Sequence, residues 1–333
     1  MKDRTRIYWQ DNIFKTEKII SFETINSGEV SDVYKVRLVD DQVYYCKVII
    51  PGKVKMLDKI PSDLRLFFSK NRQKYEVQAV KLFKRYSNKF ILPPIYKYDI
   101  KKRILILKEI KGKLLSENLS ACLNKSLVEK LAAAAAELVN NTYKKVKFVR
   151  GRDEDEKIRK VRVKYLYSHN FDKIKTSYPE IKKLIHEFTK ISRRQRSCLC
   201  HGDYQPKNVI VTNTGRIGLI DFEEAIVHDP AFDISFFLAR LILSSVQDKG
   251  LKNKILSSAK LLIESFLNRL QINEDRDEIQ YRINHYTAGA IMLRVDGISR
   301  QKWMNKKQAE LLRKFSANLI IASRNKTVDL LNL

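Results

Sequence analysis

The sequence predicts an α+β protein of two lobes, in which a small antiparallel sheet with one helix precedes a larger, mainly helical part. Three observations predict this fold class. Short runs of β-branched and aromatic residues, separated by turn residues, fill the chain up to about Gly112. Helical periodicity dominates the rest of the chain. The 333 residues exceed the usual size of a single hydrophobic core, so we expect two units, residues 1–112 and 113–333.

Composition places the chain among ordinary globular proteins. Hydrophobic residues make up 44% of it, and no apolar run approaches the roughly 20 residues that span a bilayer. The N-terminus has no hydrophobic segment of a signal peptide, so we expect a cytoplasmic protein without a membrane partner. Four cysteines lack metal-binding spacing and are expected to be reduced and structural.

The formal net charge of +27 is the strongest anomaly in the composition. Such a charge permits binding to nucleic acid or to other anionic partners. Lysine and arginine are nevertheless spread along the whole chain and interleaved with acids, and no recognisable nucleic-acid motif is present. A solvated basic surface is therefore favoured over a nucleic-acid partner, which the charge still permits.

The first predicted hairpin pairs residues 19–25 with residues 32–38. Small residues at its tip, Ser27 and Gly28 among them, would let the turn fold over phosphate groups and offer backbone N–H donors. An ordinary hairpin turn explains the same residues equally well. The tip is therefore a candidate phosphate-binding loop and no more.

The next predicted strand, residues 43–50, carries one lysine, Lys47, in an apolar run. A lysine there must reach water or find an anionic partner, because burying it unpaired is costly. In the helix predicted over residues 71–86, Glu76 shares one face with Val80 and Phe83. A solvated glutamate is the commoner outcome for such a residue.

A second hairpin and a series of helices complete the prediction. The hairpin joins residues 95–100 to residues 103–110 and leads to a flexible connection at Gly112. Ser126 is expected to cap a helix that carries an alanine run. Helical patterns, two of which could also be extended, then occupy most of the chain: residues 157–167, 179–191, 234–243, 252–270, 278–298 and 306–323.

The most informative segment runs from residue 199 to residue 233. His201 and Asp203 enter a loop that ends at Asn208, a hairpin turns at residues 212–215, and the return strand ends on Asp221. Magnesium prefers oxygen ligands, and phosphoryl transfer uses a carboxylate that accepts the proton of the attacking hydroxyl. Asp203 is therefore the candidate base, with Asn208 and Asp221 as candidate Mg²⁺ ligands. A single acid in this segment would be explained better as a solvated turn residue. The order of His201, Asp203, Asn208 and Asp221 together favours a phosphoryl-transfer site.

This pattern resembles the catalytic core of the aminoglycoside phosphotransferase and choline kinase superfamily, whose fold is protein-kinase-like. The residues that match the family pattern are His201, Gly202, Asp203, Asn208, Ile220 and Asp221. Phe232 and Asp233 match a downstream pair in which the aspartate braces the catalytic loop, so His201 and Asp233 are expected to support its structure. The sequence from Asp221 to Glu223 is similar to choline and methylthioribose kinases, which adds Glu223 as a possible Mg²⁺ ligand.

The resemblance implies further roles, with ATP and Mg²⁺ as the cofactors. Lys47 would hold the α- and β-phosphates and pair with Glu76. Backbone groups between Glu109 and Lys111, in the hinge between the lobes, would bind the adenine edge. A C-terminal segment similar to methylthioribose kinases implies three substrate-contacting candidates: Arg294, Arg300 and Trp303.

The sequence thus predicts an ATP-dependent kinase acting on the hydroxyl group of a small molecule such as a sugar, an amino alcohol or an aminoglycoside. One alternative is an atypical protein kinase of the same fold. Gly202, where protein kinases usually have arginine, and the lack of an Ala-Pro-Glu segment weigh against it. The other alternative is a catalytically idle scaffold or nucleic-acid-binding protein, which the intact set of candidate base and metal residues disfavours.

Overall fold

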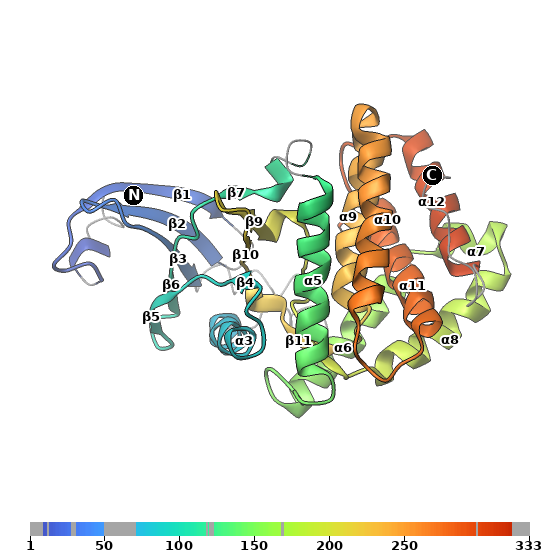
Figure 1. Ribbon diagram of the computed structural model, residues 1–333, viewed down its shortest axis with the longest axis horizontal. Helices are drawn as coiled ribbons and strands as arrows, with labels where there is room; N and C mark the ends of the chain where they lie inside the picture. The colour runs from blue at the N-terminus through green and yellow to red at the C-terminus, as the bar shows by residue number, and fades with distance from the viewer. Residues whose placement is uncertain are drawn as a thin grey trace.

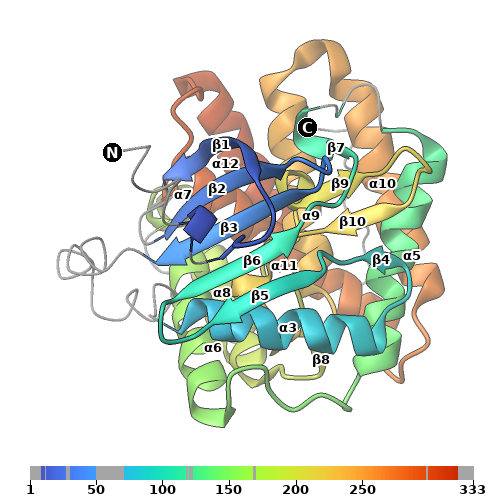
Figure 2. The ribbon, with the colours of Figure 1, turned by 90° about the vertical axis from the view of Figure 1, so that its left-hand side faces the viewer.

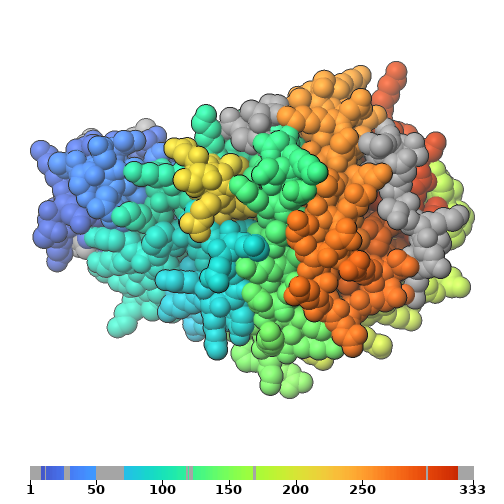
Figure 3. Space-filling model, viewed as in Figure 1, coloured from blue at the N-terminus to red at the C-terminus, as the bar shows by residue number. Residues whose placement is uncertain are grey.

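A computed structural model of the protein describes residues 9–11, 13–27, 31–49, 71–117, 119, 123–167, 170–297 and 299–321. The molecule is elongated, with a β-rich end that carries strands β1 to β3 and a helical end that carries α8 to α12 (Figure 1). The β-rich end is the narrower of the two in the space-filling view (Figure 3). The predicted α+β fold class is confirmed.

The β-rich end is a five-stranded sheet in the order β1-β2-β3-β6-β5, with every neighbouring pair antiparallel. Its strands are β1 (Ile19–Ser27), β2 (Ser31–Leu38), β3 (Val43–Ile49), β5 (Ile95–Asp99) and β6 (Ile104–Lys108). Alternating side chains of β1, β2, β3 and β6 form a small hydrophobic core that also contains Trp9 and Phe14. Both predicted hairpins are therefore present.

Helix α3 (Arg72–Tyr86) lies alongside the sheet, next to β5 (Figure 2). Its buried face includes Glu76, Val80 and Phe83, as the helical spacing predicts. Phe83 is fully buried and packs edge-on against Phe222, a residue of the second half of the chain. The helix thus connects the sheet to the segment that carries the acidic loop.

Two smaller sheets lie between the five-stranded sheet and the helices. One has the order β4-β10-β9-β7 and combines short strands from distant parts of the chain: β4 (Phe90–Ile91), β7 (Lys113–Leu114), β9 (Val209–Val211) and β10 (Ile217–Leu219). The other pairs β8 (Cys198–Cys200) with β11 (Ile226–His228). The predicted hairpin after Asn208 is the antiparallel pair β9–β10.

Gly112 lies where the chain passes from the first sheet into the second. A Cβ atom at this position would be 2.5 Å from the carbonyl oxygen of Val211. A side chain cannot be accommodated there without moving the backbone, so glycine is required by the close approach of two strands.

Helices make up most of the rest: α5 (Lys125–Thr142), α6 (Arg152–Tyr167), α7 (Asp172–Ser177), α8 (Glu180–Arg194), α9 (Phe232–Gln247), α10 (Lys252–Arg269), α11 (Arg276–Val295) and α12 (Lys306–Ile321). They enclose the larger hydrophobic core, which includes the fully buried Phe237 of α9 and the alanine run of α5. Among the described residues, no helix is both long and apolar enough to cross a membrane.

One local prediction is wrong. The cap of α5 is Asn124, whose side chain accepts a hydrogen bond from the N–H of Leu127, and Ser126 lies inside the helix. Asn and Ser cap equally well, so the choice depends on where the backbone leaves the extended conformation. The three described cysteines are free and buried as expected, whereas Cys122 lies outside the described residues.

Candidate active site

The site is organised around Lys47 of β3, which joins the two ends of the molecule. Its Nζ atom lies 2.7 Å from Oε1 of Glu76 and 2.8 Å from Oδ1 of Asp221. Glu76 is buried on α3, and Asp221 follows β10. The isolated lysine of an apolar strand therefore finds two carboxylates, one of them the predicted partner.

These contacts determine the protonation states of Lys47 and Asp221. Burial alone would lower the pKa of Lys47, but the carboxylates of Asp221 and Glu76 outweigh it and raise the pKa. The pKa of Asp221 is correspondingly lowered, since the charge of Lys47 exceeds the cost of burying the carboxylate. Lys47 is thus a fixed positive charge and Asp221 a fixed negative one at neutral pH.

The backbone of Ile220 connects the loop that holds Asp203 to Asp221. Its N–H donates to the carbonyl oxygen of Asn208 over 3.1 Å, and its carbonyl accepts from Nε2 of His201 over 3.0 Å. Nδ1 of His201 accepts from the N–H of Asp203, so the ring is neutral with its proton on Nε2. Burial lowers the pKa of His201 to about 4, which keeps this arrangement neutral.

Asp233, at the start of α9, holds the other side of the loop. Its carboxylate oxygens accept from the N–H groups of His201 at 2.6 Å and Gly202 at 2.9 Å. Burial raises the pKa of Asp233 to about 6, although the two N–H donors oppose the shift. Gly202 has φ of +82°, and a Cβ there would lie 2.0 Å from the carbonyl oxygen of Glu224. Only glycine allows this close contact.

Asp203 is surrounded by donors from its own loop. Oδ2 accepts from Nδ2 of Asn208 at 2.9 Å and lies 3.1 Å from Nζ of Lys207, while Oδ1 accepts from Nε2 of Gln205. The loop therefore fixes the direction of the Asp203 carboxylate. Because Asn208 directs its amide N–H₂ toward Asp203, the sequence's grouping of Asn208 with Asp221 as metal ligands stays a prediction.

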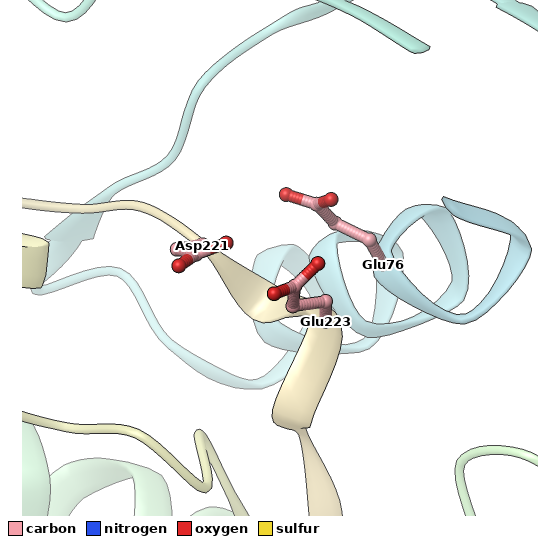
Figure 4. A group of neighbouring side chains, drawn as sticks. All are labelled: Glu76, Asp221 and Glu223. Carbon is pink, nitrogen blue, oxygen red and sulfur yellow. The ribbon is translucent and has the colours of Figure 1, made fainter. Parts of the chain in front are cut away.

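Three carboxylates converge between α3 and the short 3₁₀ segment η5 (Phe222–Glu224), as Figure 4 shows for Glu76, Asp221 and Glu223. One oxygen of each lies within 4.8 Å of the others. Burial, followed by the charge of Asp221, raises the pKa of Glu223 to about 8, although Arg72 pairs with the same carboxylate. Hard oxygen ligands at this spacing fit Mg²⁺, and a bound cation would favour ionised Glu223.

Asp221 has a left-handed backbone, with φ of 69° and ψ of 62°. A non-glycine residue rarely adopts this conformation, and it costs about 1–3 kcal/mol where it does. Here it turns the chain sharply after β10 and leads into η5, which carries Glu223. The backbone thus brings both acids to α3.

The predicted adenine-binding segment connects β6 to β7. The N–H of Glu109 donates to the carbonyl oxygen of Val43, and its carboxylate lies 3.6 Å from Nζ of Lys35. Lys111 is exposed. Within the described chain no hydrogen bond engages the backbone N–H or carbonyl of Ile110, which lies between them. At the other predicted nucleotide contact, Ser27 ends β1 with its side chain undescribed, and Gly28 lies outside the described residues.

Comparison with known proteins agrees with this geometry. A sequence model of the phosphotransferase enzyme family (APH) matches residues 22–253. The chain belongs to this family. A search of curated protein sequences found no match.

Solved structures of the same fold include members of the predicted superfamily. Aminoglycoside 2′-phosphotransferase-IIIa in complex with GDP has 15% identity and a TM-score of 0.59, covering 95% of this chain and 99% of the other. The streptomycin–ATP–APH(2″)-IIa ternary complex has 15% identity and a TM-score of 0.55, covering 97% and 99%. Choline kinase LicA from Streptococcus pneumoniae has 14% identity and a TM-score of 0.53, covering 95% and 99%. The specific resemblance to methylthioribose kinases stays a prediction.

The three substrate candidates of this phosphotransferase-family chain lie in different places. Trp303 lines a cavity of about 190 Å³ beside the loop that holds Asp203, together with Pro206 and Lys207. Arg294 lies in the last turn of α11, where burial lowers its pKa and the charge of Asp203 opposes that shift. Arg300 is exposed and lines another hollow near α12, so the structure separates it from Trp303.

Sequence reasoning missed several arginines that hold the site of this family member in place. Arg162 of α6 donates to the carbonyl oxygens of Gly202 and Glu224, both at 2.8 Å. Arg150 donates to the carbonyl oxygens of Glu223 and Ala225, both at 2.6 Å. No local pattern distinguishes these arginines in a basic chain, because their partners are distant in sequence.

Sequence reasoning also missed Arg240, although the sequence of α9 contains a feature that could have identified it. It is the single charged residue in the long apolar stretch of α9 that comes after Asp233. Its side chain lines the cavity that contains Trp303. A charge on an otherwise apolar buried helix needs a compensating partner, which could have marked Arg240 as a candidate.

Proposed function

We propose that the protein is a kinase that transfers the γ-phosphate of ATP to the hydroxyl group of a small molecule. The observation that carries the proposal is the position of Lys47, within hydrogen-bond distance of both Glu76 and Asp221. Lysine, helix glutamate and aspartate arranged in this way suit the phosphates and the metal of a nucleotide. Membership in the phosphotransferase enzyme family and a fold shared with nucleotide-bound relatives support it.

In the proposed reaction, the acceptor oxygen forms a bond to the γ-phosphorus while the bond from that phosphorus to the β,γ-bridging oxygen breaks. The acceptor hydroxyl gives its proton to a carboxylate oxygen of Asp203, and ADP carries away the charge of the leaving oxygen. Gln205, Asn208 and Lys207 keep the Asp203 carboxylate oriented. Mg²⁺, held by Asp221 with Glu223 or Asn208, would supply charge neutralisation at the phosphates.

Nucleotide binding and acceptor binding would be divided between the two lobes of the chain. We propose residues 1–112 as the nucleotide-binding lobe, with Lys47, Glu76 and the backbone near Ile110, and residues 113–333 as the lobe that holds the base and the acceptor. The cavity beside Asp203's loop supports a small-molecule acceptor over a protein one, because its volume of about 190 Å³ suits a small molecule.

Nucleotide binding with and without Mg²⁺ tests the proposal. The measurement is isothermal titration of ATP, and of GTP for comparison, into the wild-type protein and Asp221→Asn. We expect binding that Mg²⁺ strengthens in the wild type, and loss of that Mg²⁺ effect in Asp221→Asn, since the amide cannot supply a charged ligand. Absence of nucleotide binding, or a Mg²⁺ effect that survives in Asp221→Asn, would contradict the assignment.

A further inference from the structure

We propose that the acceptor of this kinase carries an anionic group, a carboxylate or a phosphate ester, which Arg240 and Arg294 bind while its hydroxyl faces Asp203. The inference rests on the proposed function, because it names the class of molecule that would occupy the acceptor side of the same site. It is drawn from the charges around one cavity.

The cavity lies next to the catalytic loop and has a volume of about 190 Å³. This is several times the roughly 30 Å³ that a water molecule occupies in the liquid, so the space is suited to a small metabolite. Its larger polar lining residues are Lys207, Arg240, Gln247 and Gln301, and Trp303 forms an apolar wall.

Positive charge predominates around this cavity. Lys207 and Arg240 line it, and no carboxylate of the described residues does so. Arg294 is close enough to repel Arg240, and its backbone carbonyl accepts from the N–H of Gln301, another lining residue. Two cations thus line the space and Arg294 lies near it; Lys207 pairs with Asp203, whose charge also acts on both arginines. Glu117 and Asp248 line an adjoining hollow that shares Gln247 with this cavity, so the two arginines mark its positive side.

The two arginines differ from other arginines packed into this part of the molecule. Arg159, Arg162 and Arg282 are buried, and each donates to at least one oxygen at 3.1 Å or less. Arg240 and Arg294 are half-buried, yet among the described residues neither guanidinium forms a hydrogen bond or an ion pair. Burial, followed by repulsion from Arg294, lowers the pKa of Arg240 to about 10.

Desolvated guanidinium groups without a partner are costly, whereas a carboxylate or phosphate can accept two parallel hydrogen bonds from each. An anionic acceptor group would therefore be bound strongly here. A cationic acceptor would lose its hydration and meet two guanidinium groups that have no counter-charge. The charge pattern favours a hydroxylated acid over an amino alcohol or an aminoglycoside.

Trp303 provides a direct readout of this cavity. The chain contains two tryptophans, and Trp9→Phe leaves Trp303 as the only one. In this background and in the presence of Mg²⁺ and a non-hydrolysable ATP analogue, fluorescence is titrated with glycerate, glycerol 3-phosphate, glycerol, choline and kanamycin. We expect saturable binding of glycerate or glycerol 3-phosphate, whichever headgroup fits, and weaker or no binding of the neutral and cationic probes.

Substitutions then assign the effect to the two arginines. Arg240→Gln and Arg294→Gln should each weaken binding of the anionic probe by about tenfold or more, and Arg240→Lys should retain part of the affinity. Arg276→Gln is the matched control. Arg276 is exposed at the other end of α11, about 27 Å along the helix from Arg294, and should leave the titration unchanged.

The outcomes separate this inference from the proposed function. Choline or kanamycin binding more tightly than both anions would overturn the inference, as would anion binding that is unaffected in both Gln variants or absent altogether. Nucleotide binding, measured on the same proteins, reports on the kinase assignment independently. Its absence would remove the proposed function, whereas its presence with a cation preference would remove only the anionic acceptor.

Discussion

Nζ of Lys47 lies 2.8 Å from Oδ1 of Asp221, although 174 residues separate them in the sequence. The contact joins the five-stranded sheet to the segment after β10, and Glu76 on α3 completes it. The side chain of Lys47 is 13% exposed and that of Glu76 is 1% exposed. Removing one member therefore leaves a buried charge without its counter-charge.

We expect Lys47→Met to lower the free energy of unfolding by about 3–5 kcal/mol, the usual cost of breaking a buried ion pair from one side. Urea denaturation followed by circular dichroism measures it. The double variant Lys47→Met/Glu76→Gln should recover part of the loss, because one of the uncompensated carboxylates becomes neutral. Nucleotide binding should remain impaired in both variants.

Lys35→Met is a matched control on the neighbouring strand. Lys35 pairs with Glu109 at 3.6 Å, but both side chains are about one quarter exposed. Its removal should cost less than about 1 kcal/mol. Equal effects of the two lysine variants would show that the contact of Lys47 has no special energetic role.

Asp203→Asn should reduce phosphoryl transfer by about 10²–10⁴-fold, since an amide cannot accept the proton of the acceptor hydroxyl. Nucleotide affinity should stay near the wild-type value, because the proposed role of Asp203 is on the acceptor side. ADP formation with a responsive acceptor measures the first quantity, and nucleotide titration the second. Asp275→Asn, which keeps a good helix cap at the start of α11, should be fully active. Turnover retained in Asp203→Asn would reject Asp203 as the base.

Much of this site could be predicted from sequence because its core is local. His201, Asp203, Asn208 and Asp221 lie within one loop and one hairpin, whose turn residues are recognisable. Lys47 was identified because a lone cation in an apolar strand requires a partner. These predictions depended on spacing and on local chemistry, and the structure places the residues in one region.

The contacts that sequence could not supply depend on the packing of distant helices. Arg162 reaches the loop at Gly202 across 40 residues, and Arg150 reaches Glu223 across 73. In a chain with 65 lysines and arginines, no pattern distinguishes such residues from solvated ones. The cap of α5 was misplaced from Asn124 to Ser126 for a related reason, since two good capping residues lie within one turn.

Gly202→Ala should be more destabilising than Gly151→Ala. Both glycines have positive φ, but a Cβ at Gly151 would meet no atom within 4 Å, whereas at Gly202 it would lie 2.0 Å from the carbonyl oxygen of Glu224. The left-handed backbone alone costs about 1–2 kcal/mol with alanine. The collision should add about 1–3 kcal/mol or more. Similar midpoints of urea unfolding for the two variants would contradict the close contact at Gly202.

The buried His228 should make the protein sensitive to acid. Burial, followed by the charges of Arg159 and Arg162, holds its pKa well below 6.5. The ring stacks on Phe232, with centroids 4.5 Å apart, and Nε2 has no hydrogen-bond partner among the described residues. Protonation in the folded state would therefore bury a charge beside two arginines.

In the unfolded chain His228 takes up a proton near pH 6.5, whereas in the folded protein it does not. The unfolded state thus binds more protons below pH 6.5, and the free energy of unfolding must fall as the pH falls. For one histidine the slope is about 1.4 kcal/mol per pH unit. Comparing urea unfolding of the wild type and His228→Gln between pH 7 and pH 5 isolates this contribution, because the other titrating groups are common to both. The variant should be less stable at pH 7 but lose less stability on acidification, and parallel pH profiles would show that folded His228 titrates normally.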